Sequence, residues 1–202
     1  MVPLLYYNIE RYYMDDTNYW NTFYESKHVS SPSDFCTFVM EYFAGKDIKK
    51  VMDCGCGNGR DSYTLAHSYN VRAVDNCGMI PSSSDDKLSF VNDDFVTIDK
   101  RGYDMVYSRF TFHSITNQQQ YEFINTIPIG CYLAIETRSM TDEDTEFVHG
   151  TTHYRNLTDL KYVTQLIISN GFEIIYMKED KNFAKYKDEN PVCIRLICKR
   201  IN

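Results

Sequence analysis

The sequence lacks any run of apolar residues as long as the roughly 20 that a transmembrane helix needs. Its start has no basic leader, long apolar stretch or small-residue cleavage site, so we expect no secretory signal. The 21 Lys and Arg residues are outnumbered by 28 Asp and Glu residues and are scattered along the chain. Because phosphate binding draws much of its affinity from clustered cations, this pattern argues against nucleic acid as a partner. We therefore expect a cytoplasmic protein without a membrane span.

Patterns for disulfides and for metal sites are also missing. The seven cysteines are an odd number without the spacing of a disulfide framework, and most lie in strand-like apolar segments. This indicates reduced, buried thiols. Cys54 and Cys56 form a C-x-C pair, but no second Cys/His pair at zinc-ligand spacing follows them. The sequence therefore predicts no metal site.

The length of 202 residues and a hydrophobic content of 43% are those of one folded domain with a sizeable core. The first part of the chain is rich in tyrosine and contains the only tryptophan, Trp20. Ser33 is placed as a helix N-cap, and apolar residues then recur at helical spacing until Gly45. We expect a single domain over residues 1–202, in which residues 1–45 form a helical, aromatic-rich cap.

Strand and helix patterns alternate along the rest of the chain, which favours a parallel sheet with helices on both faces. After a helix over residues 159–169, two strands follow without a helix between them, and such neighbours are most simply antiparallel. The predicted fold class is α/β, a Rossmann-like doubly wound sheet that is mostly parallel with one antiparallel edge strand. The expected strands are residues 48–54, 71–75, 88–93, 103–110, 131–137, 172–179 and 192–200, and the expected helices between the first five are 60–69 and 118–127.

A glycine-rich turn, VMDCGCGNGR at residues 51–60, joins the first of these strands to the helix that follows. Glycine at such a turn lets the backbone approach a ligand closely. The dinucleotide pattern G-x-G-x-x-G needs glycine where this chain has Arg60, and no Gly-Lys-Ser/Thr closes the loop as in a Walker motif. A nicotinamide cofactor and a P-loop nucleotide are therefore disfavoured.

The run VMDCGCGNG resembles the first motif of class I S-adenosylmethionine-dependent methyltransferases, which reads hydrophobic-hydrophobic-Asp-x-Gly-x-Gly-x-Gly. The resemblance covers about residues 48–136 and implies a seven-stranded sheet with S-adenosylmethionine as cofactor. It implies that Asp75, which ends the second strand, binds the ribose hydroxyls, and that Asp93 or Asp94 contacts the adenine amine. Arg60 would lie near the methionine carboxylate. The cofactor-binding residues so implied are Asp53, Gly55, Cys56, Gly57, Gly59, Arg60, Asp75, Asn76, Asp93, Asp94, Phe95 and Ser108.

Polar residues follow the fourth and fifth strands, at the carboxyl edge where open α/β sheets bind their ligands. His113 can take a proton from a hydroxyl or be a packed structural histidine, and Arg109 can clamp an anion or pair with a nearby carboxylate. Our catalytic candidates are Arg109, His113 and His153, and our substrate-binding candidates are Glu136, Arg138, Tyr154 and Arg155.

The stretches RFTFHSI, IETRS, HYR and KNFAKYKDENPVCIRLICK resemble bacterial methyltransferases associated with surface-polysaccharide biosynthesis. This resemblance implies a sugar hydroxyl or phosphate oxygen as methyl acceptor, on a small molecule, a sugar nucleotide or a glycan. One alternative is an RNA or mRNA cap methyltransferase, because CGNGRDS is similar to their C-G-x-G-G-D loop. The other is a catalytically inactive partner subunit that binds S-adenosylmethionine.

Overall fold

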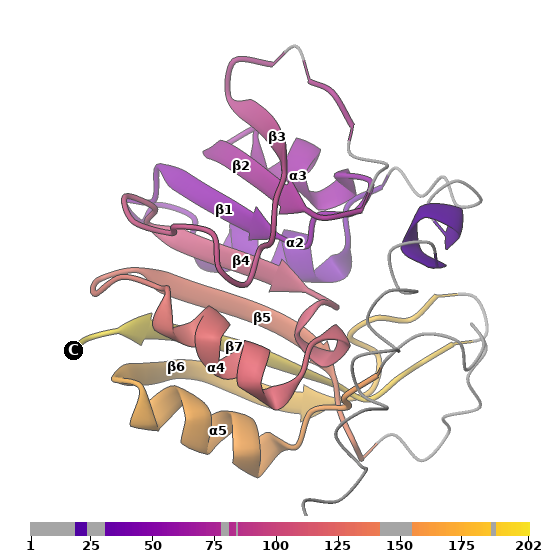
Figure 1. The fold of residues 1–202 in the computed structure, drawn as a ribbon, viewed down its shortest axis with the longest axis vertical. Coiled ribbons are helices and arrows are strands. Elements are labelled where there is room, and N and C mark those ends of the chain that lie inside the picture. Colours follow the sequence, from indigo (N-terminus) through magenta and orange to yellow (C-terminus); the bar gives the residue numbers. More distant parts are fainter. Residues whose placement is uncertain (1–18, 24–30, 78–80, 84, 142–154, 187–188) are drawn as a thin grey trace, which may run out of the picture.

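A computed structural model of the protein describes residues 19–23, 31–77, 81–83, 85–141, 155–186 and 189–202 (Figure 1). The described residues form a seven-stranded sheet flanked by helices. The strands are β1 (Lys50–Cys54), β2 (Asn70–Asp75), β3 (Leu88–Asn92), β4 (Met105–Arg109), β5 (Tyr132–Arg138), β6 (Phe172–Asp180) and β7 (Cys193–Arg200). The helices are α2 (Asp34–Tyr42), α3 (Arg60–Leu65), α4 (Asn117–Asn125), α5 (Leu160–Ser169) and the short 3-10 helix η1 (Phe112–Ser114).

The strand order in the sheet is β3-β2-β1-β4-β5-β7-β6. Pairs among β1 to β5 are parallel, whereas β7 runs antiparallel to both β5 and β6, so the antiparallel pairing lies at one edge of the sheet. The order reverses direction between β1 and β4, and the carboxyl ends of strands at such a switch point are where open α/β sheets bind ligands. The predicted fold class is confirmed.

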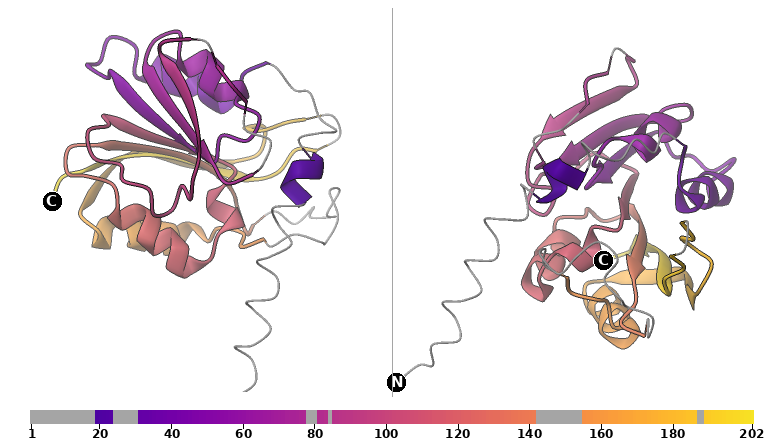
Figure 2. Two further views of the ribbon diagram at one scale, coloured as in Figure 1. Left: turned by 45° about the horizontal axis from the view of Figure 1, so that its top comes forward. Right: turned by 90° about the vertical axis from the view of Figure 1, so that its right-hand side faces the viewer.

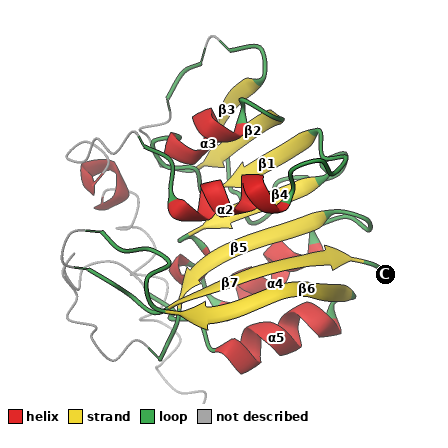
Figure 3. Ribbon diagram, turned by 180° about the vertical axis from the view of Figure 1, so that it is seen from behind, coloured by secondary structure: helices red, strands yellow, loops and turns green. Residues whose placement is uncertain are grey.

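Helices cover both faces of the sheet (Figure 3), and an apolar cluster lies on each face. On one face, α4 and α5 bury Phe123, Ile124 and Ile167 against the strands. On the other face, α2 and α3 bury residues such as Phe35 and Leu65. Because the central strands are covered on both sides, their carboxyl ends are held in fixed positions.

Local capping explains where the helices begin. Ser33 caps α2 by accepting a hydrogen bond from the backbone N–H of Cys36, as its sequence position predicted. Helix α3 ends at Leu65 rather than at the predicted Tyr69, because the N–H groups of His67 and Ser68 bond back over three residues and form a tighter turn. All seven cysteines are buried and none forms a disulfide.

Residues 19–23 form a short helical segment beside the carboxyl ends of the strands, as the views in Figures 1 and 2 show. Of the predicted aromatic cap over residues 1–45, the structure describes this segment and residues 31–45. Nowhere in the described ranges is there a helix long and apolar enough to cross a membrane.

Candidate active site

A cavity of about 490 Å3 opens at the carboxyl ends of the central strands. Tyr19, Trp20 and Phe23 of the helical segment line it on one side. The predicted site residues that line it are Asp53, Gly55, Cys56, Arg60, Asp75, Asn76, Asp94, Phe95, Arg109, His113, Arg138 and Arg155. Five other predicted site residues lie outside its lining, namely Gly57, Gly59, Asp93, Ser108 and Glu136. His153 and Tyr154 are outside the described residues.

The glycine loop after β1 is closely packed against neighbouring side chains. Gly55 has φ +78°, and a Cβ atom there would lie 1.9 Å from Cγ2 of Thr111. Gly59 has φ +76°, and its Cβ would lie 2.7 Å from the ring of Phe90. A left-handed backbone and the lack of room both require glycine, so the loop can pass directly along the cavity floor.

Asp75 at the end of β2 is bonded to the same loop. One oxygen of its carboxylate accepts the N–H of Gly57 at 2.8 Å, and the other accepts the N–H of Cys77 at 2.9 Å. Each carboxylate oxygen has a second lone pair, so the group can still accept hydrogen bonds from a ligand in the cavity. On the adenine side of the predicted site, the Asp94 carboxylate accepts the N–H of Val96 and the hydroxyl of Thr97, which fixes the turn after β3.

Asp53 is a buried carboxyl group on β1 that accepts a hydrogen bond from the Ser62 hydroxyl at 2.6 Å. Burial raises the pKa of Asp53 to about 8, and the negative charges of Asp61 and Asp75 add to the increase against the effect of Ser62. Burial therefore favours the protonated form of this carboxyl group.

The stability of the wild type relative to an Asp53→Asn variant should fall as pH rises from about 4 to about 8. The folded protein keeps the Asp53 proton up to about pH 8, whereas the unfolded chain loses it near 3.8, the ordinary pKa of an aspartate side chain. Unfolding thus releases a proton in this window, and each pH unit favours the unfolded state by up to about 1.4 kcal/mol. Urea unfolding across this range measures the difference. Asp86→Asn, at an exposed site, should keep the wild-type dependence, and parallel curves for wild type and Asp53→Asn would contradict the assignment.

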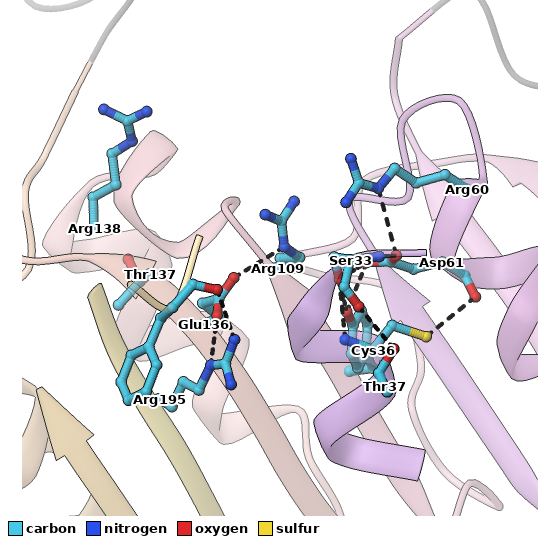
Figure 4. Close-up of polar contacts among 12 residues, drawn as sticks. Ser33, Cys36, Thr37, Arg60, Asp61, Arg109, Glu136, Thr137, Arg138 and Arg195 are labelled. Atoms are coloured by element: carbon cyan, nitrogen blue, oxygen red, sulfur yellow. Dashed lines mark hydrogen bonds and ion pairs between the residues drawn. The ribbon is translucent and has the colours of Figure 1, made fainter. Parts of the chain in front are cut away.

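Asp61 joins three elements in a hydrogen-bond network that the sequence did not reveal (Figure 4). Its carboxylate accepts the N–H and the hydroxyl of Ser33 and the phenol of Tyr107, each at 2.7 Å. Nε of Arg60 lies 3.6 Å from the carboxylate oxygen that accepts the Ser33 N–H. Burial and the charge of Asp61 raise the pKa of Tyr107 well above its ordinary value, so the phenol stays protonated and remains a donor. The network fixes the start of α2 at the cavity wall.

Glu136 is completely buried at the carboxyl end of β5 and pairs with two arginines (Figure 4). Its oxygens accept Nε of Arg109 at 2.9 Å and Nε of Arg195 at 2.7 Å. Arg195, on β7, also donates to the backbone oxygen of Phe183 at 2.8 Å. Glu136 therefore contacts these arginines rather than the cavity for which it was predicted as a substrate-binding residue. Arg195 was absent from the predicted site.

Arg138 and His113 lie at the other end of the cavity. A terminal nitrogen of Arg138 pairs with Glu189 at 3.0 Å. The backbone N–H of Arg138 donates to Nδ1 of His113 at 3.3 Å. Because Nδ1 accepts this bond, the neutral imidazole carries its proton on Nε2. Phe110, between the strand end and η1, adopts φ 61°, a strained conformation of the kind that clusters at functional sites.

In the described part of the chain, no group of three or more His, Cys, Asp or Glu side chains is arranged to hold a metal ion. The donors and acceptors around the cavity fall into two groups. Carboxylates and the glycine loop surround the ends of β1 and β2, whereas arginines surround the ends of β4 and β5. This arrangement suits a ligand with hydroxyl groups on one side and an anion on the other.

A family model described as tellurite resistance protein TehB matches residues 12–145 of the chain. No curated protein sequence matches the chain at a significant level.

Solved structures of methyltransferases share the fold. One from Anabaena variabilis has a TM-score of 0.69 at 15% identity, over 93% of this chain and 95% of that chain. One from Methanosarcina mazei has a TM-score of 0.64 at 13% identity, over 81% of this chain and 97% of that chain. The 1,6-didemethyltoxoflavin-N1-methyltransferase of Burkholderia thailandensis, solved with 1,6-didemethyltoxoflavin and S-adenosylhomocysteine, has a TM-score of 0.64 at 14% identity, over 83% of this chain and 77% of that chain. At these identities the likeness shows the fold.

Proposed function

Because the chain belongs to the tellurite resistance protein TehB family and is an S-adenosylmethionine-dependent methyltransferase, we propose that it methylates an oxygen of an anionic acceptor. The acceptor would be a small molecule, a sugar nucleotide or a glycan, with a phosphate oxygen favoured over a sugar hydroxyl. The family confirms the predicted enzyme class and cofactor. The observation that carries the proposal is that three arginines, Arg109, Arg138 and Arg155, line the cavity. We call the part of the cavity near them, at the ends of β4 and β5, the acceptor side.

The residues around the glycine loop fit the cofactor. Bound S-adenosylmethionine supplies an electrophilic methyl group on its sulfonium. We propose that Asp75 accepts the ribose hydroxyls and that Asp94 lies near the adenine. Nε of Arg60 is buried and has no hydrogen-bond partner among the described residues, although Asp61 lies 3.6 Å away. A buried donor at the cavity that makes no hydrogen bond to a described residue supports a role for Arg60 in binding the methionine carboxylate. The remaining predicted cofactor residues stay part of this proposal.

Asp75→Ala should weaken binding of S-adenosylhomocysteine, the demethylated cofactor, by about 1.5 to 3 kcal/mol, or about 10- to 150-fold. The variant loses both the proposed ribose contacts and the bond that positions Gly57. Calorimetric titration measures the effect. Asp99→Ala is the matched control, because Asp99 also accepts the N–H two residues ahead but lies outside the cavity. An unchanged dissociation constant for Asp75→Ala would refute the assignment.

The hydrogen bond from the backbone N–H of Arg138 to Nδ1 of His113 helps to distinguish between a sugar hydroxyl and a phosphate oxygen as the methyl acceptor. A sugar hydroxyl benefits from a base that removes its proton, whereas an ionised phosphate oxygen attacks without that help. The neutral His113 ring has its unprotonated nitrogen, Nδ1, directed at the backbone N–H of Arg138. We therefore propose that the attacking oxygen of the acceptor is already ionised, that Arg109 binds its charge, and that His113 lies beside it on the cavity lining. Arg138, Arg155, His153 and Tyr154 stay candidates for binding the acceptor, and Glu136 would act on it through the arginines with which it pairs.

Labelled cofactor tests the proposal directly. The protein is incubated with labelled S-adenosylmethionine and separate pools of sugar phosphates, sugar nucleotides, small carboxylates, tellurite and RNA. Tellurite belongs in the panel because the family is named for it and because an oxyanion suits the arginines. Transfer to a phosphate or another small anion supports the proposal. Label in RNA would favour the cap-type alternative, and label in no pool would favour an inactive cofactor-binding subunit.

We further propose that residues 1–202 act as one domain in the cytoplasm, with a small molecule rather than nucleic acid as partner. Two observations support this. The seven buried thiols suit a reducing compartment. The net charge of −7 disfavours polyanions.

A further inference from the structure

Arg109, Glu136 and Arg195 form a charge-unbalanced cluster beneath the acceptor side of the cavity. Two guanidinium groups share one carboxylate, so the cluster has one positive charge in excess. The side chain of Glu136 is 0% exposed, that of Arg195 is 8% exposed and that of Arg109 is 19% exposed. A charge removed from water is costly unless it is paired, so the excess charge favours an anion nearby.

Arg109 and Arg195 differ in their partners, and this difference indicates that Arg109 carries the excess charge. Arg195 donates to Glu136 and to the backbone oxygen of Phe183, and its guanidinium lies 4.3 Å from the Phe183 ring centroid. It does not line the cavity. Arg109 lines the cavity, and Glu136 engages its Nε. Arg195 is therefore used within the protein, whereas Arg109 presents its charge to the cavity.

The terminal nitrogens of Arg109 point away from Glu136 (Figure 4). Arg109 donates a hydrogen bond to Glu136 from Nε. Among the described residues, its terminal nitrogens donate no further hydrogen bond. The guanidinium also lies 4.2 Å from the Phe110 ring centroid, and that of Arg138 lies 5.6 Å from the same centroid. The bond at Nε and the ring contact restrict the plane of the guanidinium, which leaves a fork of N–H groups oriented for an oxyanion.

We propose that Arg109 forms an oxyanion subsite for the acceptor, and that Glu136 is the positioning residue that orients it. The inference rests on the proposed function and deepens it, since it names the group of the acceptor that is bound: a phosphate or carboxylate. Arg60 lies beside Asp61 at the start of α3, on the cofactor side, whereas Arg109 is bonded to β5. The cofactor carboxylate therefore has its own cation, and the Arg109 fork serves the acceptor.

Inorganic phosphate tests the subsite without knowledge of the acceptor. The protein saturated with S-adenosylhomocysteine is titrated with phosphate, and binding is followed by calorimetry and by the fluorescence of Trp20. This residue is the only tryptophan in the chain and lines the cavity. Arg109→Gln should weaken phosphate binding by about 10-fold or more and leave the affinity for S-adenosylhomocysteine unchanged. Arg101→Gln is the matched control, because it removes the same charge from an exposed pair with Asp99 and should bind phosphate normally.

Glu136→Asp tests the positioning role, because it keeps the negative charge and shortens the side chain by one methylene group. Phosphate binding should weaken while S-adenosylhomocysteine binds as before, which a merely structural role would not produce. Equal losses for both ligands would overturn that role. The subsite itself is overturned if the wild type binds no phosphate, or if Arg109→Gln loses affinity for S-adenosylhomocysteine and keeps it for phosphate. These binding measurements need no turnover. A negative result for the subsite can therefore be distinguished from a negative result for the proposed methyl transfer.

Discussion

Glu136→Gln should lower the free energy of unfolding by about 3 to 5 kcal/mol, the range for breaking a buried ion pair by removing one partner. The substitution keeps the size of the side chain but removes the carboxylate that Arg109 and Arg195 both contact, so that Asp61, which forms no ion pair with Arg109, is the negative charge that remains near Arg109. Urea unfolding followed by circular dichroism measures the loss. The matched control is Glu173→Gln on β6, which removes a negative charge at an exposed position and should cost little.

A second substitution separates charge from packing at the same place. Adding Arg109→Gln to Glu136→Gln leaves one buried cation instead of two, so the double variant should be more stable than Glu136→Gln alone. A loss below about 1 kcal/mol for Glu136→Gln would mean that the carboxylate is not the main partner of these arginines. A double variant less stable than the single one would contradict the charge argument.

Gly55→Ala should destabilise the protein by about 2 to 5 kcal/mol and abolish most cofactor binding. About 1 to 2 kcal/mol comes from placing a Cβ on a left-handed residue, and about 1 to 3 kcal/mol comes from overpacking against Thr111. The new Cβ would lie 1.9 Å from Cγ2 of Thr111. That side chain cannot simply rotate away, since its hydroxyl bonds to Ser108 and to the backbone oxygen of Cys54.

The chain provides controls for both parts of this effect. Gly45 has φ +76°, and a Cβ atom there would meet nothing within 4 Å, so Gly45→Ala should show the backbone cost alone. Combining Gly55→Ala with Thr111→Ser removes Cγ2 and should recover part of the loss. Urea unfolding and titration with S-adenosylhomocysteine measure the set. Equal costs for Gly55→Ala and Gly45→Ala would show that Thr111 does not restrict the loop.

Features that depend on neighbouring residues in the chain were predictable. Alternating strand and helix patterns gave the fold class, and turn chemistry gave the glycine loop. Ser33 was recognised as a cap because a serine before a helical run bonds to the N–H three residues later. Asp75 was identified through the resemblance of the glycine loop to the first methyltransferase motif, and the structure places it at the end of β2, beside β1 and on the cavity lining.

Features that depend on distant pairs were not predictable. Asp61 bonds to Ser33, 28 positions away, and to Tyr107, 46 positions away, and in the sequence it is an ordinary acidic residue in the first turn of a helix. Glu136 was placed at the cavity because it ends a strand. Strand β5 is buried on both faces, so its pattern of burial does not tell which side chains reach a ligand and which reach other strands. Its partner Arg195 is 59 positions away.

The position of β7 between β5 and β6 makes the order of assembly differ from the order of the chain. Within the described sheet, β6 pairs only with β7, so it cannot join the other strands until a later segment has inserted. Pairings between segments that are far apart in the sequence form slowly, because the chain between them loses conformational entropy before the stabilising contacts are made. Arg195 reaches Glu136 only when β7 docks on β5. The arginine that holds Glu136 from the far side thus depends on a pairing between remote segments, whereas Arg109 meets Glu136 through the parallel pair β4 and β5.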